Sequence, residues 1–196
     1  MMSSPEERIA VQTRIIVVGG GARSGKSRFA QAYAESLGAK RIFIATAQAF
    51  DDEMKDRIRR HQEDRGKTFE TIEEPVHLAQ ALGQAGTADV VLVDCLTLWL
   101  SNLLLQGLSR DAIAHEIEEV LAVLRLRRHQ TILVSNEVGM GIVPESPMGR
   151  EFRDIAGIAH QRLVAEADEV YLAAMGLVVR LLPSPVTALR PGELPE

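Results

Sequence analysis

The sequence is poor in cysteine and in long apolar runs, and each shortage excludes a class of protein. Cys95 is the single cysteine among 196 residues, which excludes an internal disulfide and a cysteine-rich metal cluster. The most apolar stretch, Leu96–Leu105, contains polar residues and is far shorter than the ~20 residues that span a bilayer. Residues 1–14 are polar and lack the apolar region of a signal peptide. These features predict a cytoplasmic protein without membrane insertion.

Neither sign of charge is in large excess, because 22 basic residues face 27 acidic ones and the net charge is −5. A nucleic-acid-binding surface is therefore not predicted. The length and the 46% hydrophobic content fit one domain with its own core. We expect residues 14–182 to form that domain, with a flexible polar N-terminus and a flexible proline-rich tail from Pro183.

The segment Ile15–Phe29 contains the most informative motif. Four apolar β-branched residues, 15–18, predict a buried parallel strand. The pattern Gly-x-x-x-x-Gly-Lys-Ser follows at residues 20–27 and matches a P-loop. Phe29, Tyr33 and Leu37 then recur every fourth residue and predict a helix that Gly38 ends.

Each residue type of this loop has a reason in phosphate chemistry. Glycines let the backbone N–H groups approach phosphate oxygens, and the start of the helix adds partial positive charge. Lys26 is expected to reach the β- and γ-phosphates, and the hydroxyl of Ser27 to bind Mg²⁺. The alternative is a glycine-rich turn with an incidental lysine, which the flanking strand and helix disfavour.

Strand patterns alternate with helical patterns along the rest of the chain. Strands are predicted at residues 41–46, 68–72, 90–94 and 131–135, and a hairpin at 169–174 and 177–182. Pro75 is expected at the first position of a helix, and Ser109 is expected to cap a long one. The arginines that follow that helix, at 125, 127 and 128, are interpreted as solvated. The pattern predicts a three-layer α/β fold whose mostly parallel sheet carries an antiparallel edge hairpin.

Asp94 ends an apolar strand, Val90–Val93, and two roles are open for it. It occupies the place of a Walker B carboxylate, which would hold Mg²⁺ through water beside the P-loop. It could instead cap the following helix. That helix, Leu96–Leu105, is apolar nearly all round and is expected to be buried in the core or against another subunit.

The segment Asp51–Arg65 predicts a helix with an unusual histidine. Helical spacing places His61 at the border between an apolar seam and a basic face formed with Arg57 and Arg65. A neutral imidazole there could attack phosphorus and form a phosphoramidate, with the arginines neutralising the phosphate. Spacing alone favours a satisfied, partly buried histidine instead. Four other histidines are interpreted as structural or solvated, namely His77, His115, His129 and His160.

Seven segments together resemble the bifunctional adenosylcobinamide kinase / adenosylcobinamide-phosphate guanylyltransferase family of cobalamin biosynthesis. They are GGARSGKSR (20–28), IATAQ (44–48), DDEMKDRIRRHQEDR (51–65), residues 73–75, VDCLTLWLSNLL (93–104), NEVGMGIVPE (136–145) and FRDIAG (152–157). The P-loop alone is generic, whereas the helix with His61 followed by NEVGMGIVPE and FRDIAG is specific to the family. Arg60 stands where some members have a second histidine.

The resemblance implies a RecA-like P-loop fold, a homotrimer and two reactions. ATP or GTP phosphorylates adenosylcobinamide, and GTP then donates GMP through a histidine, here His61, to give adenosylcobinamide-GDP. Lys26 and His61 are the implied catalytic residues, and Ser27 and Asp94 the implied Mg²⁺ ligands. The implied nucleotide contacts are Gly20, Gly21, Ala22, Arg23, Ser24, Gly25, Lys26, Ser27, Ala45, Thr46, Ala47, Gln62, Glu63, Asp64, Arg65, Glu73 and Asp94.

Two other functions remain as alternatives. A simple P-loop kinase of small molecules would use no covalent intermediate and would not need His61. A nucleotide-dependent switch or assembly protein would hydrolyse nucleotide slowly and bind a partner at Leu96–Leu105. Neither alternative accounts for the ordered set of motifs.

Overall fold

The computed structural model describes residues 13–48 and 68–184. The predicted helix Asp51–Arg65 and the predictions for the two termini lie outside these residues. Within the described part, seven strands form one sheet in the order β3-β2-β4-β5-β1-β6-β7. The strands are β1 (Ile15–Gly20), β2 (Arg41–Ala45), β3 (Glu70–Glu73), β4 (Val90–Asp94), β5 (Gln130–Asn136), β6 (Glu169–Ala174) and β7 (Leu177–Leu182).

All neighbouring strands pair in parallel except β6 and β7, which form the predicted antiparallel hairpin at one side of the sheet. The central strand β5 lies between β4 and β1, with Val134 opposite Asp94 and Asn136 opposite Gly20. The carboxyl ends of six strands therefore meet at one edge, called here the carboxyl edge. The opposite edge is called the amino edge.

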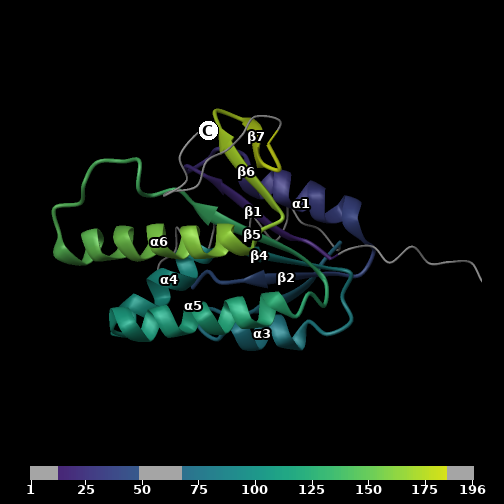
Figure 1. The fold of residues 1–196 in the computed structure, drawn as a ribbon, viewed down its shortest axis with the longest axis horizontal. Helices are drawn as coiled ribbons and strands as arrows, with labels where there is room; N and C mark the ends of the chain where they lie inside the picture. Colours follow the sequence, from purple (N-terminus) through teal and green to yellow (C-terminus); the bar gives the residue numbers. More distant parts are fainter. Residues whose placement is uncertain (1–12, 49–67, 185–196) are drawn as a thin grey trace, which may run out of the picture.

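Helices cover both faces of the sheet (Figure 1). Within the described residues, α1 (Lys26–Leu37) lies on one face, and α3 (Leu78–Gln84), α4 (Leu96–Leu105), α5 (Arg110–Arg125) and α6 (Pro147–Glu166) lie on the other. Alternate residues of the strands feed two separate cores: Ile16 and Val18 pack on α1, whereas Ile15 and Val17 face the larger helical layer. The predicted three-layer α/β fold, with a mostly parallel sheet and an antiparallel edge hairpin, is thus confirmed. None of the helices in the described ranges is long and apolar enough to cross a membrane.

The prediction that Pro75 begins a helix is wrong, because α3 starts three residues later at Leu78. Two side chains of α4 donate hydrogen bonds to the intervening backbone. Trp99 Nε1 donates to the carbonyl of Val76 at 2.7 Å, and Asn102 Nδ2 donates to the carbonyl of Pro75 at 3.0 Å. These tertiary bonds use carbonyls at the start of the expected helix.

Arg125 at the end of α5 and Arg128 just after it are exposed, as predicted, but Arg125 and the partly buried Arg127 also make ion pairs. Arg125 makes a hydrogen-bonded ion pair with Glu166 at the end of α6, at 2.8 Å. Arg127 pairs with Asp168, which precedes β6, and donates to the carbonyl of Thr13. The end of α5 is thereby tied to the beginning of the neighbouring strands. In contrast, Ser109 caps α5 as predicted and accepts from the backbone N–H of Ala112.

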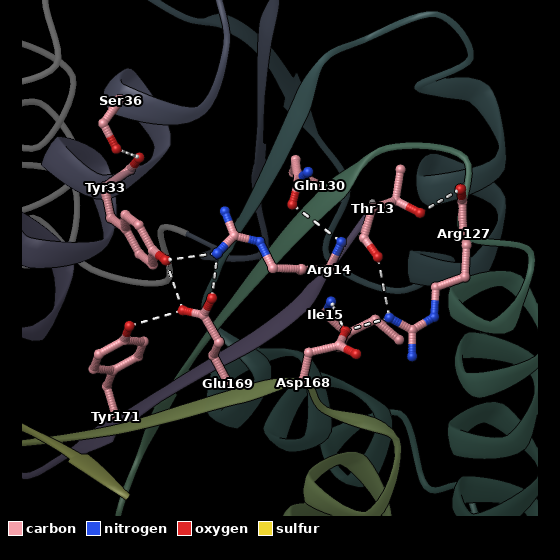
Figure 2. Close-up of polar contacts among 10 residues, drawn as sticks. All are labelled: Thr13, Arg14, Ile15, Tyr33, Ser36, Arg127, Gln130, Asp168, Glu169 and Tyr171. Atoms are coloured by element: carbon pink, nitrogen blue, oxygen red, sulfur yellow. Dashed lines mark hydrogen bonds and ion pairs between the residues drawn. The ribbon is translucent and has the colours of Figure 1, made fainter. Parts of the chain in front are cut away.

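A buried carboxylate, Glu169, joins three elements at the amino edge (Figure 2). It accepts hydrogen bonds from Arg14 before β1, from Tyr33 of α1 at 2.6 Å and from Tyr171 of β6 at 2.7 Å. The rings of Tyr33 and Tyr171 also pack edge to face, with centroids 5.8 Å apart. One carboxylate therefore links the start of β1, the start of β6 and the covering helix.

The protonation of this cluster follows from its contacts. Burial opposes ionisation of Glu169, but the hydrogen bonds from Tyr33 and Tyr171 and the charge of Arg14 outweigh it and lower the pKa of the carboxyl. Burial and the bond to Glu169 raise the pKa of Tyr33, so its hydroxyl stays a donor. Because the folded-state pKa of Glu169 lies below its unfolded value, the cluster stabilises the fold above that unfolded value, about pH 4.3, and the contribution is lost as the pH falls further.

We expect Glu169→Gln to lower the free energy of unfolding by about 2 kcal/mol at pH 7, because Arg14 would lose its buried ionic partner. Glu166→Gln is the matched control. It removes an exposed ion pair with Arg125 and should cost less than about 1 kcal/mol. Urea unfolding of the three proteins measures both values, and at pH 3 the difference between wild type and Glu169→Gln should shrink. Equal losses for the two variants would contradict the role assigned to the cluster.

Candidate functional site

The P-loop connects β1 to α1 at the carboxyl edge, and the backbone requires glycine at two of its positions, 20 and 25. Gly20 has φ +154°, and a Cβ built on it would lie 2.4 Å from the carbonyl oxygen of Ala173 on β6. Gly25 has φ +95° and directly precedes the first helical residue, Lys26. A side chain at Gly20 would collide with the neighbouring strand, and residues with a Cβ rarely adopt these torsion angles.

Two polar side chains of the loop point inward. Lys26 is only 7% exposed, and its Nζ donates to the carbonyl of Gly21 at 3.1 Å, across the loop. Ser24 Oγ is buried and has no hydrogen-bond partner. A buried hydroxyl without a partner is costly. A phosphate oxygen would satisfy it, so the loop has the features of an anion cradle as well as the sequence of one.

Asp94 ends β4, separated from the P-loop strand by β5 alone. The N-cap position of α4 is held by Cys95 and not by Asp94. Burial raises the pKa of the Cys95 thiol and the charge of Asp94 raises it further, while the charge of Lys26 acts in the opposite direction. The thiol is therefore protonated and unreactive. The charges of Asp94 and Lys26, which have opposite signs, both act on Cys95 at the carboxyl edge.

Thr46 fixes the position of this acidic strand end. Its hydroxyl accepts from the backbone N–H of Cys95 at 2.8 Å and donates to the carbonyl of Cys95 at 2.7 Å. Asn102 of α4 donates to the carbonyl of Thr46 at 2.8 Å. Thr46 is fully buried, so its hydroxyl ties β2 to β4 and is not presented to a ligand. The adjacent Ala45 and Ala47 are partly exposed.

The oxygen donors near the loop fit Mg²⁺ bound together with phosphates. Among the described residues there is no group of three or more His, Cys, Asp or Glu side chains that could hold a metal by themselves. Mg²⁺ in nucleotide sites takes one or two protein oxygens and completes its shell with phosphate and water. The hydroxyl of Ser27 and the carboxylate of Asp94 are donors of that kind, and the strand order places both at the carboxyl edge.

The structure separates Glu73 from the P-loop. Glu73 ends the outermost strand β3, four strands from β1, which corresponds to about 19 Å across the sheet. A nucleotide held at both points would extend along the carboxyl edge past β5, β4 and β2. Five further residues of the predicted site lie outside the described residues: His61, Gln62, Glu63, Asp64 and Arg65.

Sequence analysis missed a polar chain next to the P-loop. Ser135 Oγ lies 2.6 Å from His160 Nε2, and His160 Nδ1 lies 3.7 Å from Glu137 Oε2. Ser135 and Glu137 belong to β5 and its following loop, whereas His160 comes from the middle of α6. A histidine on a helical face gave no signal of this contact, since only the packing of α6 against the sheet creates it.

We expect Gly20→Ala to destabilise the fold by about 2 kcal/mol or more, because the new Cβ meets backbone and the torsion angle is unfavourable. Gly21→Ala is the control, since a Cβ at Gly21 meets no atom within 4 Å. Its free energy of unfolding should stay within about 0.5 kcal/mol of wild type. Urea unfolding distinguishes them, and an unchanged midpoint for Gly20→Ala would show that the close approach to Ala173 does not exist in solution.

Comparisons with known proteins agree on one family. The family model described as cobinamide kinase / cobinamide phosphate guanyltransferase matches residues 16–181. The chain is 41% identical to the bifunctional adenosylcobalamin biosynthesis protein CobU of Escherichia coli, over 85% of this chain and 99% of the relative. It is 42% identical to CobP of Pseudomonas aeruginosa, over 85% and 96% of the two chains.

Among solved structures, the flagellar accessory protein FlaH from Methanocaldococcus jannaschii superposes with a TM-score of 0.48 and 12% identity, over 84% of this chain and 74% of that one. The sequence matches cover nearly all of the described fold, including the P-loop, the strand end at Asp94 and the chain around Glu137. The protein belongs to the cobinamide kinase / cobinamide phosphate guanyltransferase family.

Proposed function

We propose that this protein phosphorylates adenosylcobinamide with ATP or GTP and then converts the phosphate to adenosylcobinamide-GDP with GTP. The carrying observation is the anion cradle, with its buried Lys26 and the unpartnered Ser24 hydroxyl, in a chain of this family. We treat residues 14–182 as one catalytic P-loop domain and place the enzyme in the cytoplasm. The single buried cysteine is consistent with a reducing compartment.

In the kinase reaction, the P-loop N–H groups and Lys26 bind the β- and γ-phosphates. The hydroxyl of the substrate attacks the γ-phosphorus, and the bond from that phosphorus to the bridging oxygen breaks. The nucleoside diphosphate leaves with the electron pair of that bond. The positive charge of Lys26 and the loop N–H groups stabilises the charge that builds on the leaving group.

In the guanylyltransferase reaction, His61 attacks the α-phosphorus of GTP and pyrophosphate leaves. The P-loop grips the leaving group in this step, which suits a loop that binds the β- and γ-phosphates. An oxygen of adenosylcobinamide phosphate then attacks the phosphorus, the P–N bond breaks and His61 is regenerated. Two easier displacements replace one difficult one. The contacts proposed for the guanine nucleotide include Ala45, Ala47, Glu73 and residues 62–65.

Mg²⁺ would be held by Ser27 directly and by Asp94 through water. When bound, it would supply positive charge to the phosphate oxygens. Thr46 would contribute by holding the end of β4, and with it the Asp94 carboxylate, in place. This role needs no contact between Thr46 and the nucleotide.

We expect intact mass measurement to detect an acid-labile gain of one GMP after wild type is incubated with GTP and Mg²⁺. His61→Ala should show no gain, because the phosphoramidate needs the imidazole. His115→Ala, at an exposed position of α5, is the control and should gain GMP as wild type does. No adduct on wild type would leave a P-loop kinase without the covalent step. An adduct on His61→Ala would move the nucleophile to another residue.

We propose a homotrimer, which the family resemblance implies. Edge strand β7 is consistent with a contact between subunits, since Leu177, Val179 and Leu181 are exposed on it. Light scattering after gel filtration should therefore give three times the chain mass of 21.5 kDa. Leu177→Lys together with Val179→Lys should shift that mass toward one chain if β7 forms the contact. A monomeric wild type would contradict the assembly.

A further inference from the structure

The backbone of Glu137 lies next to the P-loop, and its carboxylate is held by Gly139 and faces His160. The backbone N–H of Glu137 donates to the carbonyl of Gly20 at 3.0 Å, so this residue begins beside the first glycine of the loop. Its Oε1 accepts from the backbone N–H of Gly139. A Cβ at Gly139 would lie 2.9 Å from that oxygen, so the glycine lets the carboxylate fold back onto the chain.

The end of β5, directly before Glu137, is anchored to α4. Asn136 donates to Thr97 Oγ1 from its backbone N–H at 3.0 Å and from its side-chain amide at 2.8 Å. Thr97 is buried, with 4% of its surface exposed. The position of Glu137 is therefore set by contacts of its neighbours with β1 and α4 as well as by its own.

His160 faces Glu137 as a neutral imidazole. Burial lowers the pKa of His160, and the charge of Glu137 offsets this only in part. We place the proton on Nδ1, which lies 3.7 Å from the carboxylate, so that Nε2 accepts from the hydroxyl of Ser135. The contact with Ser135 holds the orientation of the ring.

Serine, histidine and an acid also form the nucleophile, base and orienting acid of serine hydrolases. Here the serine is buried and the acid is partly exposed, which is the reverse of the arrangement in those enzymes. Ser135 is 1% exposed and cannot meet a substrate, whereas the side chain of Glu137 is 27% exposed. The carboxylate is therefore the end of the chain that can react. A carboxylate repels phosphate oxygens, so it does not suit phosphate binding, but it suits a neutral hydroxyl that must lose a proton.

We propose that Glu137 accepts the proton of the cobinamide hydroxyl that attacks the γ-phosphorus, and that His160, oriented by Ser135, positions its carboxylate. The inference rests on the proposed kinase reaction. The O–H bond breaks and its proton passes to a carboxylate oxygen of Glu137. The hydroxyl oxygen bonds to the γ-phosphorus, and the nucleoside diphosphate leaves with the electrons of the bridging bond. Glu137 then returns the proton to water.

The test compares two reactions of one protein, of which only the first deprotonates an alcohol. Glu137→Gln keeps the shape of the side chain and removes the carboxylate that acts as the base. We expect kcat for phosphorylation of cobinamide to fall by roughly 10²- to 10⁴-fold. The yield of acid-labile GMP adduct with GTP alone should stay at the wild-type level. Glu151→Gln is the matched control, an exposed carboxylate at the start of α6, and should retain both reactions.

The outcomes separate the two proposals. Wild type without kinase activity would overturn the proposed function itself. Wild type with both reactions and Glu137→Gln with unchanged kinase activity would overturn only the role of Glu137. Loss of both reactions in Glu137→Gln to the same degree, with native urea unfolding, would show that the carboxylate supports nucleotide binding and would also overturn the role.

The positioning role of His160 has its own pair of variants. Asn carries an amide N–H near the place of Nδ1, whereas Ala leaves the carboxylate without that partner. We expect His160→Ala to lower kinase kcat by roughly 10- to 100-fold with little change in the KM for nucleotide, and His160→Asn to recover most of it. Equal activity of the two variants, or a rise in nucleotide KM that accounts for the loss, would overturn this role.

Discussion

The parallel register of β4, β5 and β1 is the constraint on which the site depends. It sets Asp94 opposite Val134 and Gly20 opposite Asn136, so three chain segments reach the carboxyl edge together. Each of the three strands is buried on both faces, and a register shift of one residue would turn every core side chain to the opposite face. The two hydrophobic cores thus fix the spacing between the phosphate loop, the acid of β4 and the carboxylate after β5.

Stability and chemistry occupy opposite edges of this sheet. At the amino edge, Glu169 gathers Arg14 and two tyrosines, and every polar partner is used within the protein. At the carboxyl edge, by contrast, the Ser24 hydroxyl is buried without a partner, and the buried Lys26 donates across its own loop to the carbonyl of Gly21. The first edge closes β1 against β6 and α1 through hydrogen bonds made within the protein. The second keeps groups whose best partners are phosphate oxygens.

Sequence patterns predicted what local chemistry determines. The β-branched run before the P-loop, the cap at Ser109, the hairpin at Met175 and the acid at the end of β4 were all correct in kind. Patterns failed where a distant side chain decided the outcome. Trp99 and Asn102 delay α3 beyond Pro75, Asp168 captures Arg127, and the packing of α6 brings His160 to Glu137. These contacts join residues 23 to 41 positions apart in the chain, and no periodicity encodes them.

The location of Glu137 has an electrostatic consequence for the whole edge. Lys26 and the loop N–H groups attract a triphosphate. The backbone of Glu137 lies beside Gly20, and its negative charge opposes that attraction by on the order of 1 kcal/mol per nearby charge. The protein nevertheless holds this carboxylate with the N–H of Gly139 and faces it with a neutral imidazole, which leaves its charge in place. A cationic partner would have cancelled the charge. Neutral partners do not, and an uncancelled carboxylate serves proton acceptance better than it serves nucleotide affinity.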